Sequence, residues 1–98
     1  MINLADYVEE NIKDMVKTLG CSECYLYKFN LVSDYSKFFE FIISSKKIVT
    51  LVISSGRSDR EVIMENSNKI AKSKNVPLHI FLSDRIDENS FIICYRKS

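Results

Sequence analysis

The residues Ile48–Ile53 form an apolar run that limits what this 98-residue chain can fold into. A strand with one face in water alternates apolar and polar residues, so a run without alternation is typical of a strand covered on both faces. The run leads into the polar turn Ser54–Asp59, where Ser58 and Glu61 have the spacing of a capping box. We therefore expect a buried strand followed by a helix, at the centre of an α/β domain.

Hydrophobic periodicity predicts helices and further strands on both sides of this run. Apolar residues at three- and four-residue steps predict helices over residues 3–19, 33–45 and 58–73. Gly20 is suited to end the first of these helices. Strands are expected at Cys24–Val32, Leu78–Leu82 and Phe91–Tyr95. Lys28 and Asn30 leave the first strand half polar on one face, which favours a place at the edge of the sheet.

We predict one domain over residues 1–98, a small three-layer α-β-α fold with the element order α-β-α-β-α-β-β. The sheet is expected to be mainly parallel, because a right-handed helical crossover returns the chain in the same direction. The last strand is expected to pair antiparallel with the strand before it as a hairpin. The alternative is a two-layer α+β sandwich, which would follow if Cys24–Val32 ran antiparallel.

The dipeptide Ser-Asp recurs every 25 residues, at Ser33-Asp34, Ser58-Asp59 and Ser83-Asp84. Each copy follows a predicted strand, so in a parallel sheet all three would lie at its carboxyl end. Ligands bind at that end in open α/β folds. Serine and aspartate also cap helices and turns, so folding alone accounts for the three copies.

The turn after the central strand is the candidate binding site. Main-chain N–H groups at a helix start attract anions, a glycine lets a phosphate approach, and an arginine adds a two-pronged grip. The candidate anion-binding residues are Ser54, Ser55, Gly56, Arg57, Ser58 and Asp59. Asp34 and Asp84 are candidate neighbours at the same end of the sheet. Their spacing does not require a cation, and we predict no metal site and no cofactor.

The cysteines and the single histidine lack the context of a catalytic device. Cys21-Ser-Glu-Cys24 is a C-x-x-C sequence, but it follows a helix and enters a strand, the reverse of a thioredoxin-like motif. His79 and Cys94 lie within apolar strands and are interpreted as core residues. A Cys21–Cys24 disulfide is conceivable in a thermophile. We identify no catalytic residues.

The second predicted helix has too many apolar residues for a single face. Deep burial on every side is hard to arrange in a chain this short, so one side is expected to meet a second subunit. The candidate interface residues are Tyr35, Phe39 and Ile43. We therefore predict self-association as a homodimer.

The overall charge argues against a partner attracted by charge alone. The 14 basic and 13 acidic residues leave a net charge of +1, which disfavours nucleic acid and membrane surfaces. No apolar run approaches the length of a membrane span, and no signal peptide is apparent. We expect a cytoplasmic protein, and the absence of glutamine hints at a thermophile.

These observations predict a small homodimeric interaction or regulatory module, and lean away from an enzyme. The first alternative is an enzyme or binder of a phosphorylated small molecule or nucleotide at the carboxyl end of the sheet. The second is weak nucleic-acid binding through the basic pairs Lys46-Lys47 and Arg96-Lys97.

Overall fold

The computed structural model describes residues 1–29 and 32–97. The chain forms a small α/β domain with the expected order of elements. These elements are η1 (Leu4–Asp6), α1 (Glu10–Thr18), β1 (Glu23–Lys28), α2 (Val32–Ile43), β2 (Lys46–Ser54), α3 (Arg60–Ser73), β3 (Leu78–Ser83) and β4 (Ser90–Lys97). Residues 30 and 31, which the sequence assigned to the end of the first strand, lie outside the described residues. No helix in the described ranges is long and apolar enough to cross a membrane.

The prediction of a mainly parallel sheet is wrong. The strand order is β1-β4-β2-β3; β4 pairs antiparallel with both β1 and β2, and the β2–β3 pair is parallel. The predicted hairpin between the last two strands is also wrong, because β4 crosses over β2 to lie in the middle of the sheet. Burial explains this position, since residues 90–95 are all buried and a strand beside β3 would be left at an edge.

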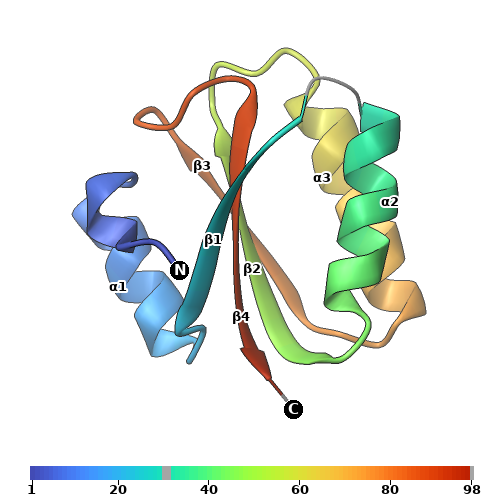
Figure 1. Ribbon diagram of the computed structural model, residues 1–98. Helices are drawn as coiled ribbons and strands as arrows, with labels where there is room; N and C mark the ends of the chain where they lie inside the picture. The colour runs from blue at the N-terminus through green and yellow to red at the C-terminus, as the bar shows by residue number, and fades with distance from the viewer. Residues whose placement is uncertain (30–31, 98) are drawn as a thin grey trace.

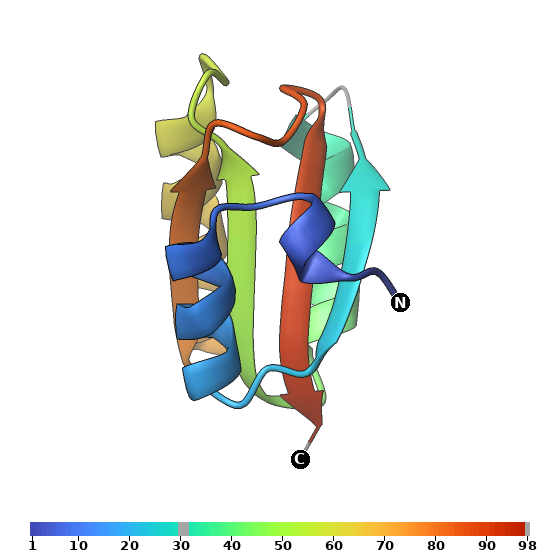
Figure 2. The same ribbon diagram turned by 90° about the vertical axis from the view of Figure 1, so that its left-hand side faces the viewer.

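Strands β1, β2 and β3 nevertheless point the same way, because β4 runs opposite to both of its neighbours (Figure 2). Their carboxyl ends therefore lie at one end of the sheet, which we call the carboxyl end. Helices cover both faces: α1 and η1 lie on one side, and α2 and α3 lie side by side on the other (Figure 1). Residues 49–54 of β2 are all buried between these layers.

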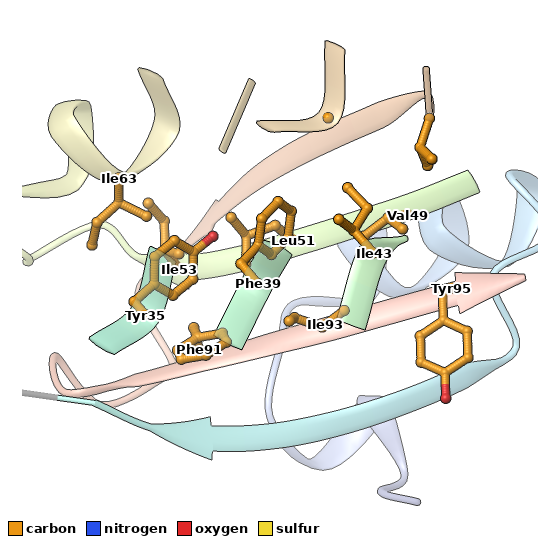
Figure 3. Packing of buried hydrophobic residues seen from close by; sticks show 12 residues of the cluster. Tyr35, Phe39, Ile43, Val49, Leu51, Ile53, Ile63, Phe91, Ile93 and Tyr95 are labelled. Atoms are coloured by element: carbon orange, nitrogen blue, oxygen red, sulfur yellow. The ribbon is translucent and has the colours of Figure 1, made fainter. Parts of the chain in front are cut away.

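The face under α2 and α3 carries the larger core. Tyr35, Phe39 and Ile43 project from α2 onto β2 and β4, where they meet Leu51, Ile53, Phe91 and Ile93 (Figure 3). All three α2 side chains are at most 1% exposed. They cannot be the dimer contacts proposed from the sequence, because they are buried within the subunit. The outer side of α2 instead presents Phe41, which is 80% exposed.

The helix predicted over residues 3–19 is two elements, broken before Glu9. This residue is the N-cap of α1, with extended backbone and no capping hydrogen bond from its side chain. Its carboxylate is used elsewhere, at the end of β3. At the other end, Gly20 has φ 79° and closes α1 as expected. The N–H of Gly20 bonds to the Lys17 carbonyl, and the N–H of Cys21 bonds to the Val16 carbonyl.

A disulfide joins Cys24 of β1 to Cys94 of β4 on the α1 face of the sheet. The two residues are direct partners across the antiparallel pair, with Cα atoms 4.1 Å apart. Cys94 is therefore not the simple core residue predicted from the sequence. Cys21 remains a buried free thiol.

Candidate functional site

The turn after β2 is closed around its own side chains. Ser54 is buried, and its hydroxyl accepts a hydrogen bond from the Gly56 N–H at 3.2 Å. A side chain on Gly56 would lie 3.2 Å from the Glu88 carboxylate. The space beside the glycine therefore faces a negative group, which would repel the phosphate that the sequence suggested.

Arg57 is bound within the domain and is not an open anion grip. Its side chain is buried, and Nε and Nη2 donate to the Asp59 carboxylate at 2.5 and 3.3 Å. Nη1 donates to the Glu88 carbonyl at 2.8 Å and to the Phe29 carbonyl at 3.4 Å. The guanidinium thereby ties together three connections at the carboxyl end of the sheet, those after β1, after β2 and before β4.

The capping box predicted from Ser58 and Glu61 does not form. Helix α3 begins at Arg60, and its N-cap is Asp59, whose side chain makes no capping bond because it holds Arg57. A shallow hollow of about 230 Å³ beside this pair is lined in part by Ser58, Asp59 and Glu88. Two carboxylates and one paired arginine make this hollow unsuited to an anion.

The three Ser-Asp pairs share one end of the molecule but do not make a site together. Asp34 is exposed in the first turn of α2, Asp59 holds Arg57, and Asp84 accepts a hydrogen bond from the Ser55 hydroxyl. Within residues 1–29 and 32–97, no three histidine, cysteine or acidic side chains are grouped to hold a metal ion.

Glu9 contributes a contact at this end that the sequence did not reveal. One carboxylate oxygen accepts from the Ser83 hydroxyl at 2.8 Å, and the other accepts from the Asp84 N–H at 3.0 Å. Burial acts to raise the pKa of Glu9, but these hydrogen bonds and the nearby charge of Arg85 outweigh it and lower the pKa. Glu9 lies 74 residues before Ser83, so no local pattern connects them.

The basic pairs of the sequence meet at the opposite end of the sheet. Lys46 and Lys97 are register partners on β2 and β4. The Lys46 ammonium lies 4.0 Å from the centre of the Tyr95 ring, and Lys97 is 3.7 Å from the Glu23 carboxylate. Both cations therefore already have partners within the domain.

A largely apolar groove lies between α1 and β3, and we call it the β3 groove. It has a volume of about 370 Å³ and is lined by Asp14, Met15, Thr18, Leu19, His79, Ile80 and Phe81. Met15 is 48% exposed, and His79 is exposed rather than in the core as predicted. The sequence does not predict that Met15 and His79 line one groove, because this depends on how α1 packs beside the edge strand β3.

Residues 9–92 match the family described as a domain of unknown function, DUF4898. The chain belongs to this family. The match runs from the N-cap of α1 into the first residues of β4, so it includes the carboxyl end of the sheet and the β3 groove. No curated protein and no solved structure matches the chain. The description of the family attaches no activity to either region.

Proposed function

We propose that this domain is a small, non-catalytic interaction module that forms a homodimer through the free edge of β3. The observation that carries the proposal is the composition of that edge. Leu78–Ser83 contains no lysine, arginine, aspartate or glutamate, in a chain of which 28% is charged. An uncharged edge strand is a template for pairing with another strand.

The hydrogen bonds of β3 define which groups are free to pair. The Val49 N–H donates to the Pro77 carbonyl, and the Ser55 N–H donates to the Ser83 carbonyl. The backbone N–H and C=O groups of the odd-numbered residues of β3 therefore point towards β2. The backbone groups of Leu78, Ile80 and Leu82 therefore point away from the sheet. A second copy of β3, antiparallel about a twofold axis, would satisfy them and join two sheets into one.

Exposed apolar side chains accompany this edge on both faces of the sheet. Leu82 is 42% exposed and has the same parity as Leu78 and Ile80, which pack on the α2 and α3 side. Met15 lies on the other face, in the β3 groove. Both would lose contact with water in the paired sheet, which adds a hydrophobic contribution to the backbone hydrogen bonds.

Binding of a phosphorylated ligand is the weaker candidate function. It required a free Arg57, and that side chain holds Asp59 and two carbonyl groups. Pairing through β3 instead uses Leu82 and Met15, which are 42% and 48% exposed and are therefore available to a partner.

Sedimentation equilibrium tests the proposal. Leu82→Lys places a charge on the exposed edge and is expected to weaken the dimer at least about tenfold. Phe41→Lys is the matched control, since it changes an exposed apolar residue on α2 and should leave the dimer intact. A monomeric wild-type protein at high concentration, or dissociation by Phe41→Lys alone, would contradict pairing through β3. A heterodimer with another chain's strand would show the edge is used but the partner is not a second copy.

We further propose a cytoplasmic protein from a heat-adapted organism. Disulfides persist in oxidising compartments and, as an exception, inside cells of hyperthermophiles. The Cys24–Cys94 bond and the absence of glutamine fit the second setting. Cell fractionation tests the location, and a thermal midpoint within the ordinary mesophile range of about 45–65 °C would contradict heat adaptation.

A further inference from the structure

The three cysteines of the chain lie together on the α1 face of the sheet. Cys24 and Cys94 are bonded across β1 and β4, and Thr50 is the partner of Cys94 on β2. The Cys21 thiol donates to the carbonyl of Ile48, also on β2, at 3.9 Å. The free thiol and the disulfide thus belong to one buried cluster.

The end of α1 places Cys21 in this cluster. The hydrogen bonds of Gly20 and Cys21 back to Lys17 and Val16 turn the chain sharply off the helix. A side chain at Gly20 would lie 3.0 Å from Nη1 of Arg96, so the turn also packs closely against β4. Cys21 is therefore held in place by the same turn that leads the chain into β1.

A cavity of about 260 Å³ opens onto two of the three cysteines. Cys21 and Cys24 line it, together with Lys13 and Lys17 of α1. Cys94 is fully buried and does not line it. A small molecule in this cavity would meet Cys24 before Cys94, with positive charge beside it.

We propose that this cavity, here called the thiol cavity, is a modification site where small anionic thiols exchange with the Cys24–Cys94 disulfide and Cys21 resolves the product. Access selects the sulfur that is attacked. Lys17 selects negative charge on the incoming thiol, because Lys13 is already paired with Glu10 at 2.9 Å. This inference is independent of pairing through β3, which involves a different part of the domain.

The exchange needs no external oxidant. The incoming thiolate bonds to Cys24 Sγ, the Cys24–Cys94 bond breaks, and Cys94 leaves as a thiolate that takes up the proton lost by the thiol. The Cys21 thiolate then bonds to Cys24 Sγ and expels the small thiolate, which takes up the proton from Cys21. The result is a Cys21–Cys24 disulfide, a free Cys94 thiol and the small thiol regenerated.

The environment of Cys21 disfavours direct attack by this thiol on the resting Cys24–Cys94 disulfide. Burial raises the pKa of the Cys21 thiol, and hydrogen bonding with Thr50 and the charge of Arg96 only partly oppose this. Cys21 is therefore mostly protonated at neutral pH. It acts second, after an external thiolate has opened the disulfide.

Disulfide mapping of the folded protein tests the first step. We would incubate the full chain with 2-mercaptoethanesulfonate, block free thiols and digest with proteases that cleave after glutamate and lysine. Cleavage after Glu23 separates Cys21 from Cys24, so each disulfide gives a distinct pair of peptides. The expected products are the Cys24 adduct and the Cys21–Cys24 bond. In Cys21→Ala the Cys24 adduct should accumulate instead.

Charge selection tests the role of the cavity. Lys17→Gln should slow exchange with the sulfonate thiol by about two- to threefold, as expected for one charge within roughly 8 Å in water. The rate with neutral 2-mercaptoethanol should not change, and high salt should remove the difference. These paired rates separate a lost charge from a general loosening of the fold.

Two results would overturn the proposal. One is an adduct on Cys94 or Cys21 in place of Cys24. The other is an unchanged Cys24–Cys94 bond in the folded protein, under conditions where the same protein in urea exchanges readily. Equal rates for anionic and neutral thiols, after correction for thiolate fraction, would overturn the selection of negative charge assigned to Lys17.

Discussion

The two edges of the sheet are protected very differently. Strand β1 has Glu23 and Lys28 at its ends, and the Ile2 N–H donates to the Cys24 carbonyl at 3.0 Å. The disulfide also ties β1 to β4. Strand β3 has neither charged residues nor a covering segment among the described residues. The outer side of β1 is thus protected by charge and by a backbone hydrogen bond, and a covalent bond fixes this strand to β4. On β3, which is paired with β2, the described extra contact is the one that Glu9 makes at the carboxyl end.

The contrast indicates that the domain can protect an edge strand, as it does at β1, and that the lack of protection is specific to β3. An exposed edge invites aggregation, and folded proteins commonly block it with charges or a covering segment. This chain uses both devices at β1. It secures β3 through Glu9 at the carboxyl end and leaves its outer backbone groups available.

Reduction of the disulfide is expected to have the largest effect on this contrast. Cys24 and Cys94 are 70 residues apart, so the bond restricts a long loop in the unfolded chain. A reducing phosphine should lower the free energy of unfolding by about 2–4 kcal/mol. Urea denaturation with and without the reductant measures this difference. Cys21→Ala keeps this disulfide and should lose as much stability on reduction as the wild type does. If the urea midpoint of the wild type did not change on reduction, the disulfide would not stabilise the fold.

Loss of Arg57 should loosen β1 next most strongly. Arg57→Ala removes charged hydrogen bonds to the connections after β1 and before β4, at an expected cost of about 2–3 kcal/mol. The Phe29 N–H, which donates to the Asn89 carbonyl, should then exchange faster with deuterium. Arg60→Ala, a more exposed change in the same turn, should cost less than about 1 kcal/mol. Equal costs for both would show that Arg57 has no special role.

Acidification should have the smallest effect on stability of the three changes, because it weakens only the contact between Glu9 and the end of β3. The pKa of Glu9 is lower in the folded state, so its stabilisation is present above the unfolded value near 4.3 and is lost as pH falls through the folded pKa. The loss should stay below about 1 kcal/mol, because this carboxylate is partly exposed.

Glu9→Gln should flatten this pH dependence, as measured by urea midpoints between about pH 6 and 3. Glu10→Gln is the matched control, because Glu10 pairs with Lys13 at the surface and should leave the profile of the wild type. A Glu9→Gln profile that follows the wild type would mean that Glu9 does not secure β3.

Local patterns in the sequence were enough to place most elements. The unbroken apolar run Ile48–Ile53 lies in the centre of β2, and Gly20 ends α1, because burial and backbone conformation act on neighbouring residues. Sheet topology was mispredicted because strand pairing is a long-range property. The sequence did contain one useful signal: Phe91–Tyr95 is as uniformly apolar as the central run, which favours the interior over a hairpin at the edge.

The candidate site was less predictable than the fold, because its contacts join distant residues. Arg57 looked available from its turn, but Phe29 and Glu88 bind it from other loops. Tyr35, Phe39 and Ile43 were interpreted as surface residues because α2 is apolar on two sides. Which side faces the sheet depends on tertiary packing. The pairing of Cys24 with Cys94 likewise follows from the register of β1 and β4.

The central place of β4 has a consequence for the order of folding. β4 follows the other three strands in the chain, yet it is the one strand that pairs with β1 in the described structure. On a ribosome, β2 and β3 can pair through the crossover that contains α3, while β1 has to wait until β4 has emerged. Sheets that depend on such distant contacts form slowly, and their unpaired strands stay exposed in the meantime. For this domain, the final strand to be synthesised is the one that turns two separate pieces into a single sheet.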